Sequence, residues 1–186
     1  NGLQVIVHED HTSTLAVMDV IYDVGSRDED PNRTGFAHLF EHLMFGGSKN
    51  IPNYDSPLQQ VGGENNAFTT PDLTNYYISV PYQNLETAFW LESDRMLQLA
   101  FNPQSLEVQR KVVIEEFKQR YLNQPYGDVW LKFRPLIYTQ HPYRWPTIGA
   151  GIQHIEEAVL EDVKEFFAKY YVPANAILVL AGRVTF

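Results

Sequence analysis

The 186-residue sequence contains no cysteine, which excludes disulfide bonds and catalysis by a thiol. It also lacks any run of about 18 apolar residues, so no segment is predicted to cross a membrane. Basic residues are scarce, because 14 Lys and Arg stand against 23 Asp and Glu, and the formal net charge is −9. A nucleic-acid partner is therefore not expected, since phosphate binding needs a basic surface, and basic peptides match this charge better.

What the sequence does contain is enough apolar material for one sizeable core, with 44% hydrophobic and 20% charged residues. It shows no internal repeat, low-complexity tract or linker, which predicts a single domain over residues 1–186. The first residue is Asn1 rather than Met, and we expect a fragment of a longer protein whose leader region is not included. The compartment of the protein therefore stays open.

The most informative segment is His38-Leu-Phe-Glu41-His42, which lies in a predicted helix. At about 100° per residue, His38 and His42 lie about 40° apart, and Glu41 lies about 60° to the other side of His38. Two neutral imidazoles suit Zn²⁺, and a nearby carboxylate that is not a ligand can deprotonate a metal-bound water, whose pKa zinc lowers to about 7. The pattern predicts metal-assisted hydrolysis with Glu41 as the base.

The alternative is structural, because this helix is apolar almost all round and a buried helix needs its histidines only to be hydrogen-bonded. Three unpaired polar groups in a core would be costly, which favours the metal site. The order His-x-x-Glu-His is also the mirror of His-Glu-x-x-His and is the inverzincin signature.

A zinc site that keeps one position for water needs a third protein ligand. The remaining histidines stand in polar or proline-flanked contexts typical of surface loops and helix starts: His8, His11, His141 and His154. In the predicted helix 106–120, Glu116 projects into an apolar stripe, whereas Glu107 and Glu115 project off it. That stripe comprises Leu106, Val108, Val112, Val113 and Phe117. A buried carboxylate is rarely left unpaired, so Glu116 is the predicted third ligand.

Gln109 precedes Glu116 by two helical turns on the same face. From there its amide is predicted to orient a metal ligand or a water molecule by a hydrogen bond, as the groups behind metal ligands commonly do.

The pattern of the whole chain is mixed. Strands are predicted at 4–8, 15–24, 66–70, 75–80 and 176–181, the last as a buried central strand. Helices are predicted at about 35–45, 53–61, 82–99, 104–122, 126–138 and 155–170. Strands interrupted by pairs of helices indicate an α+β fold, a mixed sheet covered by helices on one face.

These residues together resemble the pitrilysin family of inverzincin zinc peptidases. The likeness is to its N-terminal catalytic domain, in the bacterial two-domain-subunit branch related to mitochondrial processing peptidase. His38, Glu41 and His42 fall on the family's His-x-x-Glu-His, and Glu116 falls on its distal Glu. The segments NGLQVIV, GGENNAFTTPDLTNYY, VVIEEFKQR, HPYRWPTIG and YYVPANAILVLAGRV also resemble family landmarks, so the likeness runs over nearly the whole chain. Departures are Gln109, where some members have an acidic residue, and Arg183, where many have Asp.

The resemblance implies the metallohydrolase fold of the mitochondrial processing peptidase type and a zinc-dependent endopeptidase. It also implies that Asn66, Ala67 and Phe68 lie on a strand beside the zinc that pairs with an extended peptide, while Thr69 and Thr70 are scaffold. An S-ribosylhomocysteine lyase also carries His-x-x-Glu-His but needs a cysteine ligand, which this chain lacks.

The remaining alternative is a domain that binds metal without catalysing cleavage. Active members of the family close a chamber with a second homologous half, so a homologous domain or subunit is an expected partner.

Overall fold

The computed structural model describes residues 1–185, whose strands form one mixed sheet in the order β1-β5-β2-β4-β3. The strands are β1 (Gln4–Glu9), β2 (Leu15–Tyr22), β3 (Glu64–Thr69), β4 (Thr74–Pro81) and β5 (Ala176–Gly182). β1 and β5 are parallel, and the other neighbouring strands are antiparallel. The last strand therefore lies between the first two, and β3 forms an edge of the sheet.

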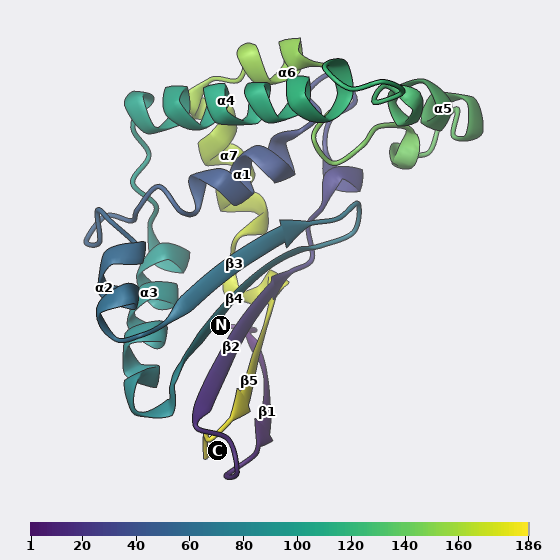
Figure 1. The fold of residues 1–186 in the computed structure, drawn as a ribbon. Coiled ribbons are helices and arrows are strands. Elements are labelled where there is room, and N and C mark those ends of the chain that lie inside the picture. The colour runs from purple at the N-terminus through teal and green to yellow at the C-terminus, as the bar shows by residue number, and fades with distance from the viewer. Residues whose placement is uncertain (186) are drawn as a thin grey trace.

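Helices cover one face of this sheet, as Figure 1 shows, so the predicted α+β architecture is confirmed. They are α1 (Phe36–Leu43), α2 (Asp55–Gln60), α3 (Leu85–Leu97), α4 (Pro103–Phe117), α5 (Val129–Ile137), α6 (Ile152–Glu156) and α7 (Leu160–Tyr170). A π-helix over Lys118–Leu122 continues α4, and 3₁₀ turns span Ser26–Asp28, Tyr82–Asn84, Pro142–Arg144 and Pro173–Asn175. Among the described residues, none of these helices has the length and apolar character needed to traverse a lipid bilayer.

Helix α1 packs against β3 on one side and α4 on the other (Figure 1). It forms because apolar side chains occupy nearly all its faces, and six of its residues are buried: Phe36, Ala37, His38, Leu39, Phe40 and Leu43. Gly35 is the N-cap residue of α1, and its φ of +89° is a conformation that glycine adopts more readily than other residues. A Cβ at Gly35 would lie 2.6 Å from the carbonyl oxygen of Ile148, so that segment crosses close to the helix start.

An aromatic layer joins α1 to the sheet. The Phe40 ring stacks on Tyr171 with centroids 4.8 Å apart, and Tyr171 lies 4.7 Å from Tyr22 of β2. Tyr22 reaches this layer because residues alternate along β2, with Ala16, Met18, Val20 and Tyr22 buried on the helix side. These contacts fix the height of α1 above the sheet.

A buried ion pair lies between α3 and the sheet. Arg95 is 1% exposed, and its guanidinium donates to Glu92 through Nε at 3.1 Å and Nη2 at 2.5 Å. The rings of Tyr54 and Tyr76 lie on the guanidinium, with centroids 4.6 and 4.5 Å from Cζ. Charge pairing and ring stacking both compensate the desolvation of this arginine.

Two sequence predictions are corrected here. The helix predicted over 155–170 is two helices, because Val159 is extended and its N–H donates to the side chain of Asp162 at 3.3 Å, which starts α7. The last strand is internal to the sheet but not buried on both faces: only Ala176 and Leu180 are buried. The helices cover one face alone, so alternate residues of β5 stay partly exposed.

The apolar face predicted for α4 is also narrower than expected. Leu106, Val113 and Phe117 are buried, but Val108 and Val112 are 50% and 44% exposed. The predicted stripe spans too wide an arc for a helix whose main contacts with other helices are those with α1 and α6.

Candidate metal centre

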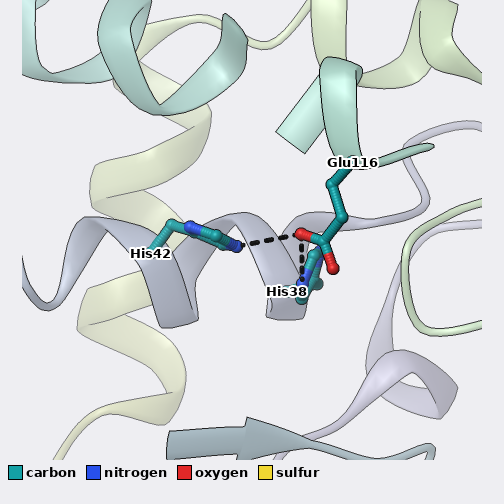
Figure 2. A group of neighbouring side chains, drawn as sticks. All are labelled: His38, His42 and Glu116. Carbon is teal, nitrogen blue, oxygen red and sulfur yellow. Dashed lines mark ion pairs between the residues drawn. The ribbon is translucent and has the colours of Figure 1, made fainter. Parts of the chain in front are cut away.

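Three donor side chains converge between α1 and α4. Figure 2 shows His38 and His42 of α1 pointing toward one oxygen of Glu116, which descends from α4. Each imidazole Nε2 lies 3.4 Å from Glu116 Oε2. All three ligand atoms lie within 4.8 Å of one another. The structure therefore brings together the three residues predicted from sequence as metal ligands.

The two helices set this geometry. His38 and His42 are one turn apart on α1, with ring centroids 4.8 Å apart and planes at 89°, so their nitrogens approach one point from two directions. Glu116 stands near the end of α4 and is only partly exposed, at 21% of its side chain. Packing of α1 against α4 brings the carboxylate to the imidazoles.

Two of the three separations between the donors match a small tetrahedral cation. Zinc binds imidazole nitrogen and carboxylate oxygen at about 2.0–2.2 Å, which places neighbouring ligand atoms about 3.3–3.5 Å apart in a tetrahedron. Both nitrogen-to-oxygen separations are 3.4 Å. The donor set, two imidazoles and one carboxylate, leaves a fourth tetrahedral position for water or substrate, as catalytic zinc sites do.

The electrostatics favour cation binding. Burial lowers the pKa of the His38 imidazole, which keeps it neutral near pH 7. Contact with the His42 imidazole lowers the pKa of the Glu116 carboxyl, which keeps it charged. Neutral imidazole and ionised carboxylate are the forms that bind metal. Protons therefore compete only weakly with a metal ion for His38 and Glu116. The Nδ1 atom of His38 is buried with no partner among the described protein atoms.

Glu41 lies on the same helix, interacts electrostatically with His42 and Glu116, and is not one of the three donors. Its Oε2 accepts a hydrogen bond of 2.6 Å from the hydroxyl of Thr69 at the end of β3. Burial raises the pKa of the Glu41 carboxyl, and the Thr69 hydrogen bond opposes that rise. A carboxyl group with a raised pKa beside a metal centre has the properties of a general base.

Thr69, predicted as scaffold, lies on the face of β3 that is turned toward α1 and bonds to Glu41 there. Residues alternate along β3, so Asn65, Ala67 and Thr69 face the helices while Asn66 and Phe68 face the other side of the sheet. Phe68 is 48% exposed there, so its side chain points away from the three donors. The Thr69 side chain makes the hydrogen bond between β3 and Glu41 of α1.

The free edge of β3 has a further feature. The backbone N–H of Ala67 donates to the side-chain oxygen of Asn66 at 2.9 Å instead of to β4. In an antiparallel ladder, alternate residues point to alternate edges, so the main chain of Ala67 faces the free edge. This edge is open to another strand once the Asn66 side chain moves.

Arg120 was not anticipated from the sequence. It lies in the π-helix after α4, and its guanidinium contacts Glu116 Oε1 at 2.8 Å, while Oε2 faces the imidazoles. π-Helical turns often occur at functional sites. The i,i+4 spacing of Glu116 and Arg120 is the signal that could have identified this pair.

The other predicted candidates do not join the centre. Among residues 1–185, His38, His42 and Glu116 form the group able to hold a metal, and the other four histidines are not part of it. His154 instead contacts the hydroxyl of Thr34 at 2.7 Å through Nδ1. In the described chain no side-chain hydrogen bond is recorded from Gln109, and its orienting role stays a prediction.

Comparison with known proteins identifies the family. The sequence matches the family described as Insulinase (Peptidase family M16) over residues 4–135, well over half of the chain. The chain belongs to this family. Within the insulinase family, the zinc protease PqqE of Helicobacter pylori is 36% identical over 99% of this chain and 42% of that protein. An uncharacterized zinc protease of Mycobacterium leprae is 31% identical, covering 98% of this chain and 41% of that protein.

Comparison of the structures gives the same family. The crystal structure of a protease from Helicobacter pylori superposes with a TM-score of 0.94 at 36% identity, over 100% of this chain and 45% of that one. The present chain therefore spans less than half the length of the relatives that it matches.

Proposed function

We propose that this chain is the metal-bearing domain of a zinc-dependent endopeptidase that hydrolyses peptide bonds in peptides or unfolded segments. The observation that carries the proposal is the convergence of His38, His42 and Glu116 on one point, with the Glu41 carboxyl beside them. The zinc proteases among its relatives support the same chemistry.

In this proposal His38, His42 and Glu116 hold the ion. When bound there, zinc polarises the peptide carbonyl and lowers the pKa of the attacking water. Glu41 takes the proton from that water as it attacks the carbonyl carbon, and then delivers the proton to the leaving amine. The Thr69 hydroxyl holds one Glu41 oxygen, which leaves the other for the proton transfer.

The edge of β3 is the proposed peptide-binding element. An extended peptide that pairs with Asn66, Ala67 and Phe68 would take the N–H of Ala67 from the Asn66 side chain and run past the metal ligands. Main-chain pairing gives affinity with little sequence preference. We propose a peptide substrate on this basis without naming its sequence.

The competing function is metal binding without cleavage by this half alone. The chain spans 42% of the length of PqqE, and a second homologous domain or subunit is a proposed partner. In that case the centre binds zinc while peptide hydrolysis requires the remainder of the protein.

Zinc content tests the proposed centre. We expect about one zinc per chain by elemental mass spectrometry, lost in Glu116→Ala and retained in Glu115→Ala, whose side chain is exposed and pairs with Lys118 at 2.6 Å. Glu41→Gln should retain zinc and lose turnover by several orders of magnitude in a peptidase assay. Absence of zinc from the wild-type protein, or normal turnover of Glu41→Gln, would contradict the proposal.

Two proline substitutions test the peptide-binding edge. Ala67→Pro removes an N–H that faces the free edge, so peptide affinity should fall while the sheet persists. Phe68→Pro removes an N–H that faces β4, so it should lower stability as well as affinity. Isothermal titration of an uncleaved peptide into the Glu41→Gln protein carrying either substitution measures the peptide affinity of that variant. Unchanged affinity in both variants would exclude strand pairing.

A further inference from the structure

Glu29 is a buried carboxyl group that the proposed chemistry does not use. It is 7% exposed and follows the 3₁₀ turn Ser26–Asp28, in a stretch of four charged residues. The carboxyl group lies at the N-terminus of α1, the helix that carries two of the three metal donors.

All three hydrogen bonds of Glu29 tie separate pieces of the chain together. Its Oε1 accepts from the N–H of Ala37 at 2.9 Å, and its Oε2 accepts from the N–H of Gly35 at 2.9 Å. Oε2 also accepts from Nε1 of Trp145 at 3.0 Å. Burial raises the pKa of this carboxyl, whereas each donor favours its charged form.

These bonds replace the cap that α1 lacks. The first N–H groups of a helix have no partner within it, and the N-cap residue, Gly35, has no side chain to supply one. Glu29 supplies both oxygens from outside the helix. The bond to Ala37 holds the backbone immediately before His38, so it acts on the first turn, where the first donor stands.

The segment that follows Trp145 closes around the same helix end. Trp145 Nε1 also donates to the carbonyl oxygen of Ser26 at 2.9 Å. The N–H of Ala150 donates to the Thr34 hydroxyl at 2.7 Å, and the Ile148 carbonyl abuts Gly35. The HPYRWPTIG segment therefore buttresses the N-terminus of α1, although it supplies no ligand atom.

We propose that Glu29, held by Trp145, is a positioning residue that fixes α1 so that His38 and His42 share one oxygen of Glu116. This inference rests on the proposed zinc centre. Metal sites tolerate errors of only about 0.2 Å in ligand distance, and groups behind the ligands typically change metal affinity by about 10–100-fold. A residue that merely stabilised the fold would leave the affinity of the folded protein unchanged.

The test compares zinc affinity with stability in the same purified proteins. Glu29→Gln keeps the side-chain shape but presents an amide N–H₂ to one of the N–H donors. We expect its zinc affinity, measured by competition with a chromophoric chelator, to fall about 10–100-fold. The visible spectrum of the Co²⁺-substituted protein should change as well, because it reports ligand geometry directly. Trp145→Phe removes one donor and keeps the ring packing, so a smaller change is expected.

The matched control is Val80→Ala, which empties space in the core at β4 and should lower the melting temperature without changing a residue of α1. If Glu29→Gln and Trp145→Phe match wild-type zinc affinity and Co²⁺ spectrum, the positioning role is wrong, whatever their melting temperatures. If Glu29→Gln does not fold, Trp145→Phe decides by the same two readouts. A full-length protein that binds zinc but cleaves no peptide refutes the peptidase proposal and leaves this test intact. A wild-type protein that binds no zinc overturns both.

Discussion

Replacing Thr69 by valine should shift the pH dependence of peptide hydrolysis. The Thr69 hydroxyl donates a 2.6 Å hydrogen bond to Glu41, and this bond holds the pKa of Glu41 below the value that burial alone would give. A hydrogen bond to a charged group contributes about 1.5–3 kcal/mol. Since about 1.4 kcal/mol corresponds to one pH unit, its loss should raise the pKa of Glu41 by about 1–2 pH units.

The sign follows from the proposed role of Glu41 as the base. Glu41 accepts a proton only as a carboxylate, so activity disappears as pH falls through its pKa. A higher pKa moves this acid limb of the kcat/KM profile to higher pH, and the loss relative to wild type should be largest in acid and smaller in alkali. Zinc content should not change, because the Thr69 hydroxyl bonds to Glu41, which is not a proposed metal ligand.

The assay is kcat/KM for a fluorogenic peptide from about pH 5 to 9. Thr69→Ser restores the hydroxyl and should return the limb toward its wild-type position. Thr70→Val is the matched control, since the Thr70 hydroxyl bonds only to backbone atoms of its own turn. An acid limb that stays in place in Thr69→Val, at full zinc content, would refute the assignment of this hydrogen bond.

Two further predictions follow from ion pairs. Arg95→Ala leaves Glu92 buried without its partner and should lower the free energy of unfolding by about 3–5 kcal/mol in urea denaturation; replacing both residues by apolar ones should recover much of that loss, and a small effect of Arg95→Ala alone would contradict this account. Arg120→Ala frees Glu116 Oε1 and should weaken zinc binding by about tenfold in chelator competition. Lys118→Ala, which breaks a pair on the same π-helix, should not weaken it, and equal effects would show that general charge and not orientation matters.

The convergence of the proposed metal donors was predictable from the sequence because each depends on local geometry. His38 and His42 are one turn apart in any helix, and Glu116 is identified by its place on a helix whose period is visible in the residues. Projecting the residues of α4 around the helix axis does not show how wide its buried face is. Val108 and Val112 were therefore wrongly placed on that face. Neighbouring helices decide that width.

The supporting residues were not predictable, because their roles depend on contacts between distant segments. Glu29 stands in the charged run Arg27–Asp30, which is typical of a solvated loop, and it is buried only because Trp145 and α1 meet there. The contact of Thr69 with Glu41 requires both the register of β3 and the height of α1 above the sheet. No pattern within either segment contains that information.

The separation of the donors along the chain has a consequence for the order of assembly. The two imidazoles are close together on α1 itself. Glu116 reaches them only when α4, which follows the β3–β4 hairpin and α3 in the chain, packs against α1. The unfolded chain therefore offers zinc an incomplete set of ligands, and we expect the ion to enter late, into a domain that is already folded. Small zinc fingers differ, because their metal is required for folding itself. Here zinc would act as a cross-link between α1 and α4 that slows the opening of the finished structure.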